Sequence, residues 1–487
     1  MGQQLEGTPA GPSEAVRALE RGLRGPAFKY VGFTLLMSWH YVLWFEPHMF
    51  GTTPLLDDSV TVAWLVNLGS TVMWLLAIAF ALGRRRHLSD LRGIAVVAGA
   101  LTSVLTCVLC LAPQSFETPA IAWGITFLLG ATEAVMWICW GERCAATGAN
   151  FSLHHIGVTF GATLVITVGI AWVLPPVATT LFAAALPLAS VGLLTLMRRD
   201  GADTYPVLLP RSIAQDGLRN IVSVSAIAFV ASVACYFLVA IIPWETLPTA
   251  EGTFTLGIAC GGAIILGFGC ISVASKGRAN IFTMIPWFLM VLIAAYSFFL
   301  SDPVMHEAAF IMATGVSSLF EVLLIMYFGI MTAKGYVTPA VAFAFSAGFA
   351  RAGIAVGNTW ASAYELMPAV AEAITPETSL MFICLIAALL IPLVKREYAI
   401  VALTSEPPTK DEVDRICEAT SEEFGLSARE SEILGLIARG HTATSISEKL
   451  VISPYTVNTH VRHIYEKMQI HKRSELLNYL NGQRSDF

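Results

Sequence analysis

Twelve apolar runs of about 20 residues dominate the first 395 residues of this chain. Hydrophobic residues make up 55% of the 487-residue sequence and charged residues only 13%, which is far from the composition of an average soluble protein. A helix needs about 20 apolar residues to cross the hydrocarbon core of a bilayer. The chain is therefore predicted to be an integral membrane protein that crosses the bilayer many times.

The predicted spans fall into two groups of six, separated by a polar segment. The first group covers residues 28–50, 59–82, 92–112, 119–140, 154–174 and 177–197, and the second covers 221–242, 254–275, 280–300, 308–332, 337–359 and 378–395. The stretches TEAVMWICWG (132–141) and FEVLLIMYFG (320–329) each place an acid eight residues before a glycine. This echo indicates a duplication, with halves at 28–197 and 221–395.

Two six-helix halves in one chain resemble the major facilitator architecture, in which a central cavity lies between the halves. The resemblance covers residues 28–395 and rests on the layout of the spans. It implies an all-α fold with twelve helices in the membrane domain. The loop GRRRHLSDLRG between the second and third spans departs from the signature loop of that family.

Basic residues occur in only one of the two alternating sets of connections between spans. That set holds Arg17, Arg21, Arg24, Arg84, Arg85, Arg86, Arg92, Arg143, Arg198, Arg199, Arg211, Arg219, Lys276, Arg278, Lys334, Lys395 and Arg396. Lys and Arg resist translocation and stay in the cytoplasm. With an even number of spans, the N-terminal segment 1–27 and the C-terminus are both cytoplasmic. We expect a multi-pass protein of the prokaryotic cytoplasmic (inner) membrane.

Ionisable side chains inside the predicted spans indicate a candidate polar site. Glu133 lies in the fourth span, Glu321 in the tenth, Arg351 in the eleventh and His40 in the first. Such groups cost several kcal/mol at bilayer depth unless they are paired or hydrated, so each is a candidate for function. Two interpretations stay open. Arg351 either only neutralises a glutamate and locks two helices together, or it helps to bind a ligand, with Trp137 as a stacking surface.

The glycines and cysteines of the spans indicate helix packing rather than metal binding or redox chemistry. The spacings Gly257/Gly261 and Gly353/Gly357 predict close helix approach. Nine cysteines are present, most of them in apolar runs, and Cys107 and Cys110 have no second pair or ligating histidine nearby. We therefore expect neither a metal site nor a cofactor. No nucleophile with a base at suitable spacing occurs, so we do not expect an enzyme.

The composition changes abruptly after residue 395. Residues 396–425 are acidic and contain Pro407 and Pro408, which end any helix that continues from the membrane, so this segment is predicted to be a linker. From residue 426 the helix signals are dense. Ser427 and Glu430 form a capping box, Gly440 ends that first helix, and a second short helix is expected at about 444–450.

A third helix is predicted to begin after Ser453, with Pro454 in its first turn. Its apolar side is Val457, Val461, Ile464 and Met468, and its opposite side is polar. A short helix, a tight turn and a capped helix with a polar outer side are typical of a helix-turn-helix that reads DNA. The predicted DNA contacts are Tyr455, Thr456, Asn458, Thr459, Arg462 and His463, with Lys449, Lys467, Lys472 and Arg473 on phosphates. Asn458 and Arg462 are the predicted base readers, because Asn pairs with adenine and Arg with guanine.

Residues LSARESEILGLIARGHTATSISEKLVISPYTVNTHVRHIYEKMQIHKRSELL resemble the LuxR-type DNA-binding domain. The resemblance covers about 55 residues within the C-terminal domain, 426–487, and implies four helices. Its fourth helix, here about 474–480, is implied to assist dimerisation through Leu476, Leu477 and Leu480. Residues 426–480 contain seven Lys and Arg against five Asp and Glu, a net charge of +2, so DNA affinity should depend on dimerisation.

These observations favour a membrane-embedded one-component transcription regulator that senses a small molecule in the membrane and binds promoter DNA with its tail. The expected partners are double-stranded promoter DNA, an unknown small-molecule ligand, the lipid bilayer and a second copy of the chain on DNA, with RNA polymerase as a further candidate. The alternative is a major-facilitator-like secondary transporter with a regulatory DNA-binding tail. A sensor of membrane state, in which the buried acids are purely structural, is a third hypothesis.

Overall fold

The computed structural model describes residues 30–46, 49–50, 58–83, 87–91, 93–111, 118–147, 156–198, 211–242, 250–274, 281–365, 375–391, 410–438 and 443–482. Every regular element among these residues is a helix, so the predicted all-α class is confirmed. The chain divides between Ser405 and Glu406 into two compact units.

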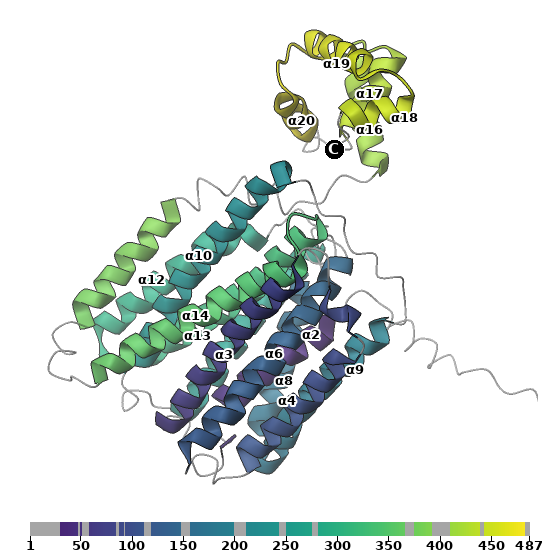
Figure 1. The fold of residues 1–487 in the computed structure, drawn as a ribbon. Coiled ribbons are helices and arrows are strands. Elements are labelled where there is room, and N and C mark those ends of the chain that lie inside the picture. The colour runs from purple at the N-terminus through teal and green to yellow at the C-terminus, as the bar shows by residue number, and fades with distance from the viewer. Residues whose placement is uncertain are drawn as a thin grey trace, which may run out of the picture. The chain divides into compact units, whose positions relative to one another are not determined.

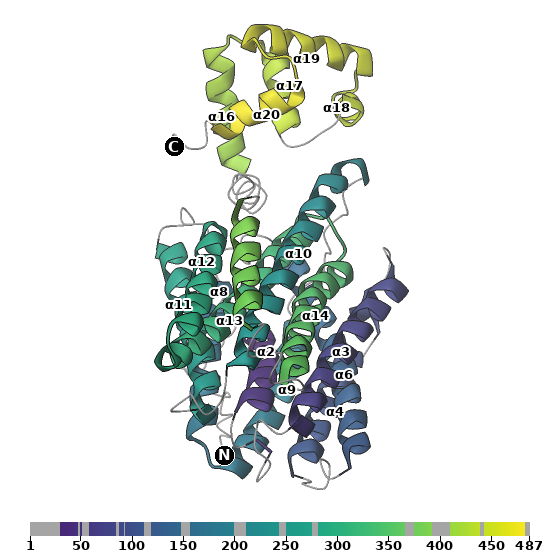
Figure 2. The same ribbon diagram turned by 90° about the vertical axis from the view of Figure 1, so that its left-hand side faces the viewer.

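The larger unit is a bundle of long apolar helices that lie side by side (Figures 1 and 2). Its helices are α2 (Val31–Phe45), α3 (Asp58–Leu82), α4 (Ile94–Leu111), α6 (Pro119–Thr147), α8 (Ile156–Val173), α9 (Pro176–Arg198), α10 (Arg211–Ile241), α11 (Ala250–Ala274), α12 (Ile285–Ser301), α13 (His306–Ala333) and α14 (Pro339–Glu365), followed by a helix at Thr375–Ile391. Ten helices among the described residues are long and apolar enough to cross a membrane. The α2 and Thr375–Ile391 helices are apolar but shorter. Each predicted run overlaps one of these helices, and several helices, such as α6 and α10, extend beyond it.

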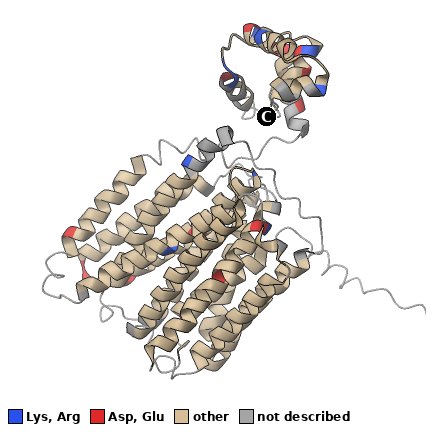
Figure 3. Cartoon of the chain, in the orientation of Figure 1, with Lys and Arg blue, Asp and Glu red and all other residues tan. Residues whose placement is uncertain are grey.

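The outer surface of this bundle is apolar. Lys, Arg, Asp and Glu are sparse along its helices (Figure 3). Large apolar side chains face outward instead, and Phe80, Val173 and Trp287 are 92%, 85% and 60% exposed. Such a surface is unfavourable in water and favourable in hydrocarbon, as expected for helices surrounded by lipid.

Helices of the two predicted halves pack directly on one another. Helix α8 packs on α11, and α3 and α6 pack on α14. Small residues allow the α8–α11 contact, because a Cβ atom at Gly161 would overlap the backbone of Leu266. The predicted close approaches are also confirmed: a Cβ at Gly261 would lie 2.7 Å from the Gly315 carbonyl oxygen of α13, and one at Gly353 would lie 2.5 Å from the Phe229 carbonyl oxygen of α10.

The smaller unit has a hydrophobic core of its own. Its helices are α16 (Lys410–Glu423), α17 (Ala428–Ala438), α18 (Ala443–Leu450), α19 (Pro454–Met468) and α20 (Arg473–Gly482). The core contains the apolar side predicted for α19: Val457, Ile464 and Met468 are buried, and Val461 packs against them while partly exposed. The start of α19 is also as predicted, because the Ser453 side chain accepts a hydrogen bond from the Thr456 amide and Pro454 occupies the first turn.

Helix α16 lies within the segment that the sequence predicted to be a linker. Ile416 and Cys417 are each 6% exposed and belong to the core of the smaller unit. The helix packs on α17 and α20, and the Tyr479 hydroxyl donates to the Glu423 carboxylate at 2.6 Å. Glu418, Glu422 and Glu423 of this helix are exposed, while Ile416 and Cys417 are buried, so the acidic segment forms an amphipathic helix.

Glu430 fixes the start of α17 and ties it to α19. Its Oε2 accepts hydrogen bonds from the Ser427 amide at 2.7 Å and from Lys467 Nζ at 2.8 Å, and the Glu430 amide donates to Ser427 Oγ at 3.4 Å. The predicted capping box is thus confirmed. The Lys467 and Ser427 hydrogen bonds lower the pKa of Glu430 to about 2. Because the carboxylate is stabilised in the folded state, it contributes stability above the unfolded pKa, and this stability is lost as the pH falls from about 4.5 towards 2.

Glu430→Gln should lower the free energy of unfolding of the smaller unit by about 1 to 2 kcal/mol at pH 7, because Lys467 loses its partner. The effect should shrink as the pH falls from 4.5 to 2, since the wild-type carboxylate becomes protonated there. Urea unfolding of residues 406–487, followed by circular dichroism, measures both quantities. Glu432→Gln is the matched control, because Glu432 pairs with Arg429 at 49% exposure and should contribute little. A loss for Glu430→Gln that is independent of pH would contradict this assignment.

Candidate functional site

A buried guanidinium joins two carboxylates at the middle of the membrane unit. Arg351 of α14 lies with Nη2 at 2.6 Å from Oε1 of Glu133 on α6, and with Nη1 at 3.2 Å from Oε1 of Glu321 on α13. The exposed fractions of the Arg351, Glu133 and Glu321 side chains are 2%, 0% and 17%. The structure therefore brings together three of the residues predicted for the polar site, and it does so across the two predicted halves.

The other two predicted members also lie in this cluster. His40 Nδ1 of α2 is 3.4 Å from Glu133 Oε1. The Trp137 indole N–H donates to the same oxygen at 3.3 Å, and its ring lies under the Arg351 guanidinium, with 4.6 Å between Cζ and the ring centroid. This arrangement adds a cation–π contact to the ion pairs. The name intramembrane cluster is used below for His40, Glu133, Trp137, Glu321 and Arg351.

Two further residues of the site were missed by the sequence analysis. The Tyr41 hydroxyl donates to Glu321 Oε2 at 2.7 Å, and the Thr71 hydroxyl donates to Glu133 Oε2 at 3.3 Å. A tyrosine or threonine in an apolar run carries no charge that would single it out in a sequence. Each carboxylate thus has a neutral donor in addition to the guanidinium, which lowers the cost of burying it.

The hydrogen-bonding capacity of the intramembrane cluster is not fully used. Arg351 Nε is buried and has no hydrogen-bond partner among the described residues. Buried polar atoms without partners are rare in folded proteins and call for an explanation. Arg351 Nε thus offers one hydrogen-bond donor that the described contacts of the cluster do not use.

Arg351→Met should destabilise the membrane unit by about 3 to 5 kcal/mol, because it leaves two buried carboxylates without a counter-charge. The triple variant that adds Glu133→Gln and Glu321→Gln should recover most of this loss, since it removes the charges. Thermal unfolding of the purified full chain in detergent checks both expectations. Arg219→Met is the matched control, because Arg219 is exposed. Equal melting temperatures for Arg351→Met and Arg219→Met would contradict the pairing.

Helix α19 presents its predicted DNA-reading side to solvent. Tyr455 is 83% exposed, and Asn458 and Arg462 are also exposed. Arg462 Nε lies 3.7 Å from Glu466 Oε1, but both side chains are about two-thirds exposed (69% and 65%), so solvent screens this pair and Arg462 remains available. Thr459 is half-buried, and its hydroxyl donates to the Tyr455 carbonyl, while Thr456 contributes to the cap with Ser453.

The basic residues predicted to contact phosphates differ in their surroundings. Lys449 and Lys472 are exposed. Lys467 Nζ instead donates to Glu430 Oε2 and, at 2.9 Å, to the Gly425 carbonyl, so its ammonium first stabilises the smaller unit itself. Arg473 Nη2 donates to the Ile437 carbonyl at 3.5 Å. His463 is 44% exposed, with Nδ1 at 3.8 Å from Glu430 Oε1.

The leucines predicted to form a dimer contact lie inside the smaller unit. Leu476 is 0% exposed and Leu480 is 6% exposed, and both belong to its hydrophobic core. Their predicted role is therefore wrong for this fold, because side chains that fill the core are not available to a second copy. The Leu477 side chain lies outside the described residues.

Glu430, His460 and His463 are close enough for their ligand atoms to lie within 4.8 Å of one another. Two histidines and a carboxylate are a donor set that zinc accepts. However, the Lys467 ammonium is 2.8 Å from the same carboxylate and repels a second cation. The contacts of Glu430 with Lys467 and His463 link α17 to α19.

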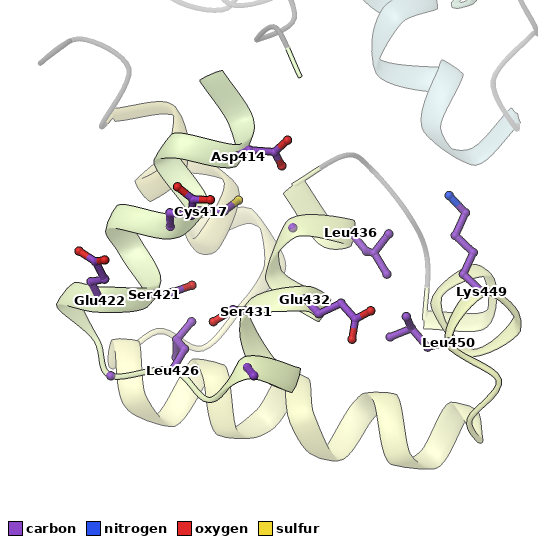
Figure 4. A pocket seen from close by; sticks show the side chains of 14 residues that line it. Asp414, Cys417, Ser421, Glu422, Leu426, Ser431, Glu432, Leu436, Lys449 and Leu450 are labelled. Atoms are coloured by element: carbon purple, nitrogen blue, oxygen red, sulfur yellow. The ribbon is translucent and has the colours of Figure 1, made fainter. Parts of the chain in front are cut away.

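A groove of about 930 Å³ opens between α16, α17 and α18 (Figure 4). Asp414, Glu418 and Glu422 line it on the α16 side, Glu432 and Leu436 on α17, and Lys449 and Leu450 on α18. The groove was not predicted from the sequence, because residues 396–425, which include α16, were expected to be a linker. The described acidic side chains of the groove make it unsuitable for DNA, whose phosphates they would repel.

The C-terminal residues of the chain are similar to known bacterial regulatory proteins. Residues 425–480 match the family model described as bacterial regulatory proteins, luxR family. Oxygen regulatory protein NreC of Staphylococcus epidermidis is 36% identical over 78 residues, which cover 16% of this chain and 36% of that protein. NreC of Staphylococcus carnosus is 46% identical over 54 residues, which cover 11% of this chain and 25% of that protein. The chain thus spans about a third or less of the length of these curated relatives.

The larger unit is similar to a solved transporter. A variant of the fucose:proton symporter FucP of E. coli aligns with a TM-score of 0.44 and 12% identity, over 78% of this chain and 98% of the symporter. The agreement at the C-terminal end is the more specific one, because it combines a family match with identities of 36% to 46%. Residues 425–480 of this chain form a LuxR-family regulatory domain.

Proposed function

We propose that this chain is a membrane-embedded, one-component transcription regulator. In this proposal the membrane unit senses a small molecule and the LuxR-family domain binds promoter DNA. The observation that carries the proposal is the presence, in one chain, of a LuxR-family domain and a bundle of membrane-spanning helices around a buried charged cluster. An enzyme is not proposed.

The proposed DNA surface is the exposed side of α19. A helix of this size fits the major groove, where Asn and Arg distinguish bases through paired hydrogen bonds. Exposed Asn458 and Arg462 stand one helical turn apart on that side, and Tyr455 precedes them by another turn. Lys449 and Lys472 are the proposed phosphate contacts.

The proposed sensing site is the intramembrane cluster. A ligand shifts a conformational equilibrium only by its difference in affinity for two states. The contacts of Arg351 join α6 to α13 and α14, so any ligand that competes for Glu133, Glu321 or Arg351 changes the free energy with which the two predicted halves hold together. That property makes the cluster a suitable place for a signal to enter.

The proposed topology has twelve spans, with both ends of the chain in the cytoplasm of a prokaryote. Ten long helices and two shorter apolar helices among the described residues support the proposed twelve spans, and the confinement of Lys and Arg to one set of connections supports the orientation. We propose binding to DNA as a homodimer, because helix-turn-helix proteins read paired half-sites. RNA polymerase is a further proposed partner.

Arg462→Ala should weaken binding to the preferred DNA sequence by about 1 to 3 kcal/mol, the contribution of a bidentate guanine contact. Binding to unrelated DNA should change far less. Fluorescence anisotropy with the full chain in nanodiscs, at one fixed salt concentration, measures both affinities. Glu418→Ala is the control, because Glu418 is exposed on α16 and is not one of the proposed DNA contacts. Unchanged sequence preference in Arg462→Ala would remove Arg462 from the readout.

Glu321→Gln should shift or abolish the response of a reporter gene to an inducing compound, because it changes one of the two carboxylates that hold Arg351. The measurement is a dose–response curve in cells, using a library of small acidic, neutral and basic compounds. Glu307→Gln is the control, since Glu307 lies in the first turn of the same helix. An unchanged curve would argue against sensing at this cluster. Accumulation of the same compound by vesicles that carry the tail-less chain would instead favour transport.

A further inference from the structure

We infer that the intramembrane cluster selects a positively charged organic ligand, an ammonium of small size. This inference rests on the proposed sensing function and specifies the chemical class of what is sensed. It starts from a charge imbalance. Two carboxylates, those of Glu133 and Glu321, face one guanidinium, that of Arg351. With the imidazole of His40, 3.4 Å from Glu133, in its neutral form, the cluster has one more formal negative charge than positive, at a depth where an unbalanced charge costs several kcal/mol.

Glu321 is the carboxylate with the excess charge. Glu133 is completely buried and has the shorter contact with Arg351, 2.6 Å, together with the Trp137, Thr71 and His40 contacts. Glu321 is 17% exposed and is held by Arg351 at 3.2 Å and by the Tyr41 hydroxyl. The less strongly held and more accessible group is the one that a ligand cation can approach without separating the Arg351–Glu133 pair.

Aromatic side chains extend from Glu321 toward the C-terminal end of α2. Tyr41 contacts Phe45, with 6.0 Å between ring centroids, and Phe45 contacts Trp64 at 5.4 Å and Phe254 at 4.8 Å. Trp64 in turn contacts Tyr236 at 5.7 Å. Rings from α2, α3, α10 and α11 thus form one continuous wall. Aromatic faces attract ammonium groups, and several of them together favour quaternary ammonium ions in particular.

A second buried carboxylate lies at the far end of this aromatic wall. Glu46 directly follows α2 and is 1% exposed, and its Oε2 accepts from the Thr255 hydroxyl at 3.1 Å. Its Oε1 has no hydrogen-bond partner among the described residues. A buried carboxylate oxygen without a donor attracts a cation through its charge, and it can accept a hydrogen bond only from an ammonium that carries an N–H or from water. The wall is therefore acidic at both ends, with Glu321 at one and Glu46 at the other, which disfavours anions along its length.

The experiment compares ligands that differ in charge but not in shape. The probes are benzyltrimethylammonium and its neutral carbon isostere neopentylbenzene, with tetramethylammonium as a smaller cation and benzenesulfonate as an anion. Binding to the full chain in nanodiscs is followed by tryptophan fluorescence. At least one ammonium should bind about tenfold or more tightly than the neutral and anionic probes, because charge contributes attraction that shape alone lacks.

Glu321→Gln should reduce the affinity for the ammonium by about tenfold or more and leave binding of the neutral probe unchanged. Glu307→Gln should leave both unchanged. Equal binding of the neutral and cationic probes, preference for the anion, or absence of binding by both ammonium ions would overturn the inference. A fluorescence change that follows pH but not ammonium concentration would also overturn it, because a proton would then balance the charge. In each of these cases a reporter response that depends on Glu321 would leave the proposed sensing function standing.

Discussion

The contact of Arg351 with Glu133 and Glu321 is the interaction on which the membrane unit depends. A guanidinium surrounded by apolar helices is tolerable only with its charge compensated, and here the compensation comes from two other helices. The positions of α6, α13 and α14 are therefore linked by electrostatics as well as by packing. Because apolar helices in lipid gain little from mutual burial, such polar contacts and the close approaches at glycines carry much of the specificity of the assembly.

The sequence predicted the members of this cluster because charged residues are conspicuous in apolar runs. Glu133, Glu321 and Arg351 lie in different predicted spans, and no spacing rule connects residues 188 and 30 positions apart; only their cost in lipid selects them. The same criterion could not select Tyr41 or Thr71, whose side chains are ordinary in such runs. It also could not find the Tyr41–Tyr236 aromatic wall, since aromatic residues are common in membrane helices and their contacts depend on how distant helices pack.

In the smaller unit, sequence patterns that depend on neighbouring residues predicted the structure correctly. Predictions that depend on contacts between distant parts of the chain did not. Capping residues and helical spacing predicted the start and the buried side of α19, because those features depend on neighbours along the chain. Leu476 and Leu480 show the limit of the same reasoning. An apolar stripe on a helix indicates that the stripe is covered, but not whether its own domain or a second copy covers it. Helix α16 was not predicted for a related reason. Its core contacts come from only a few apolar residues in an acidic segment.

Modest DNA affinity of a single copy suits the proposed regulator. Residues 426–480 have a net charge of +2, and Lys467 is already engaged by Glu430, so few cations remain for phosphate contacts. Occupancy of paired half-sites then depends on how often two LuxR-family domains meet, because linking two weak binders raises their combined affinity through effective concentration. Membrane units that associate or separate on ligand binding would change that concentration without altering α19. In the proposed regulator, ligand binding at the intramembrane cluster would then need to change only how often two copies pair, which requires a smaller conformational change than remodelling α19.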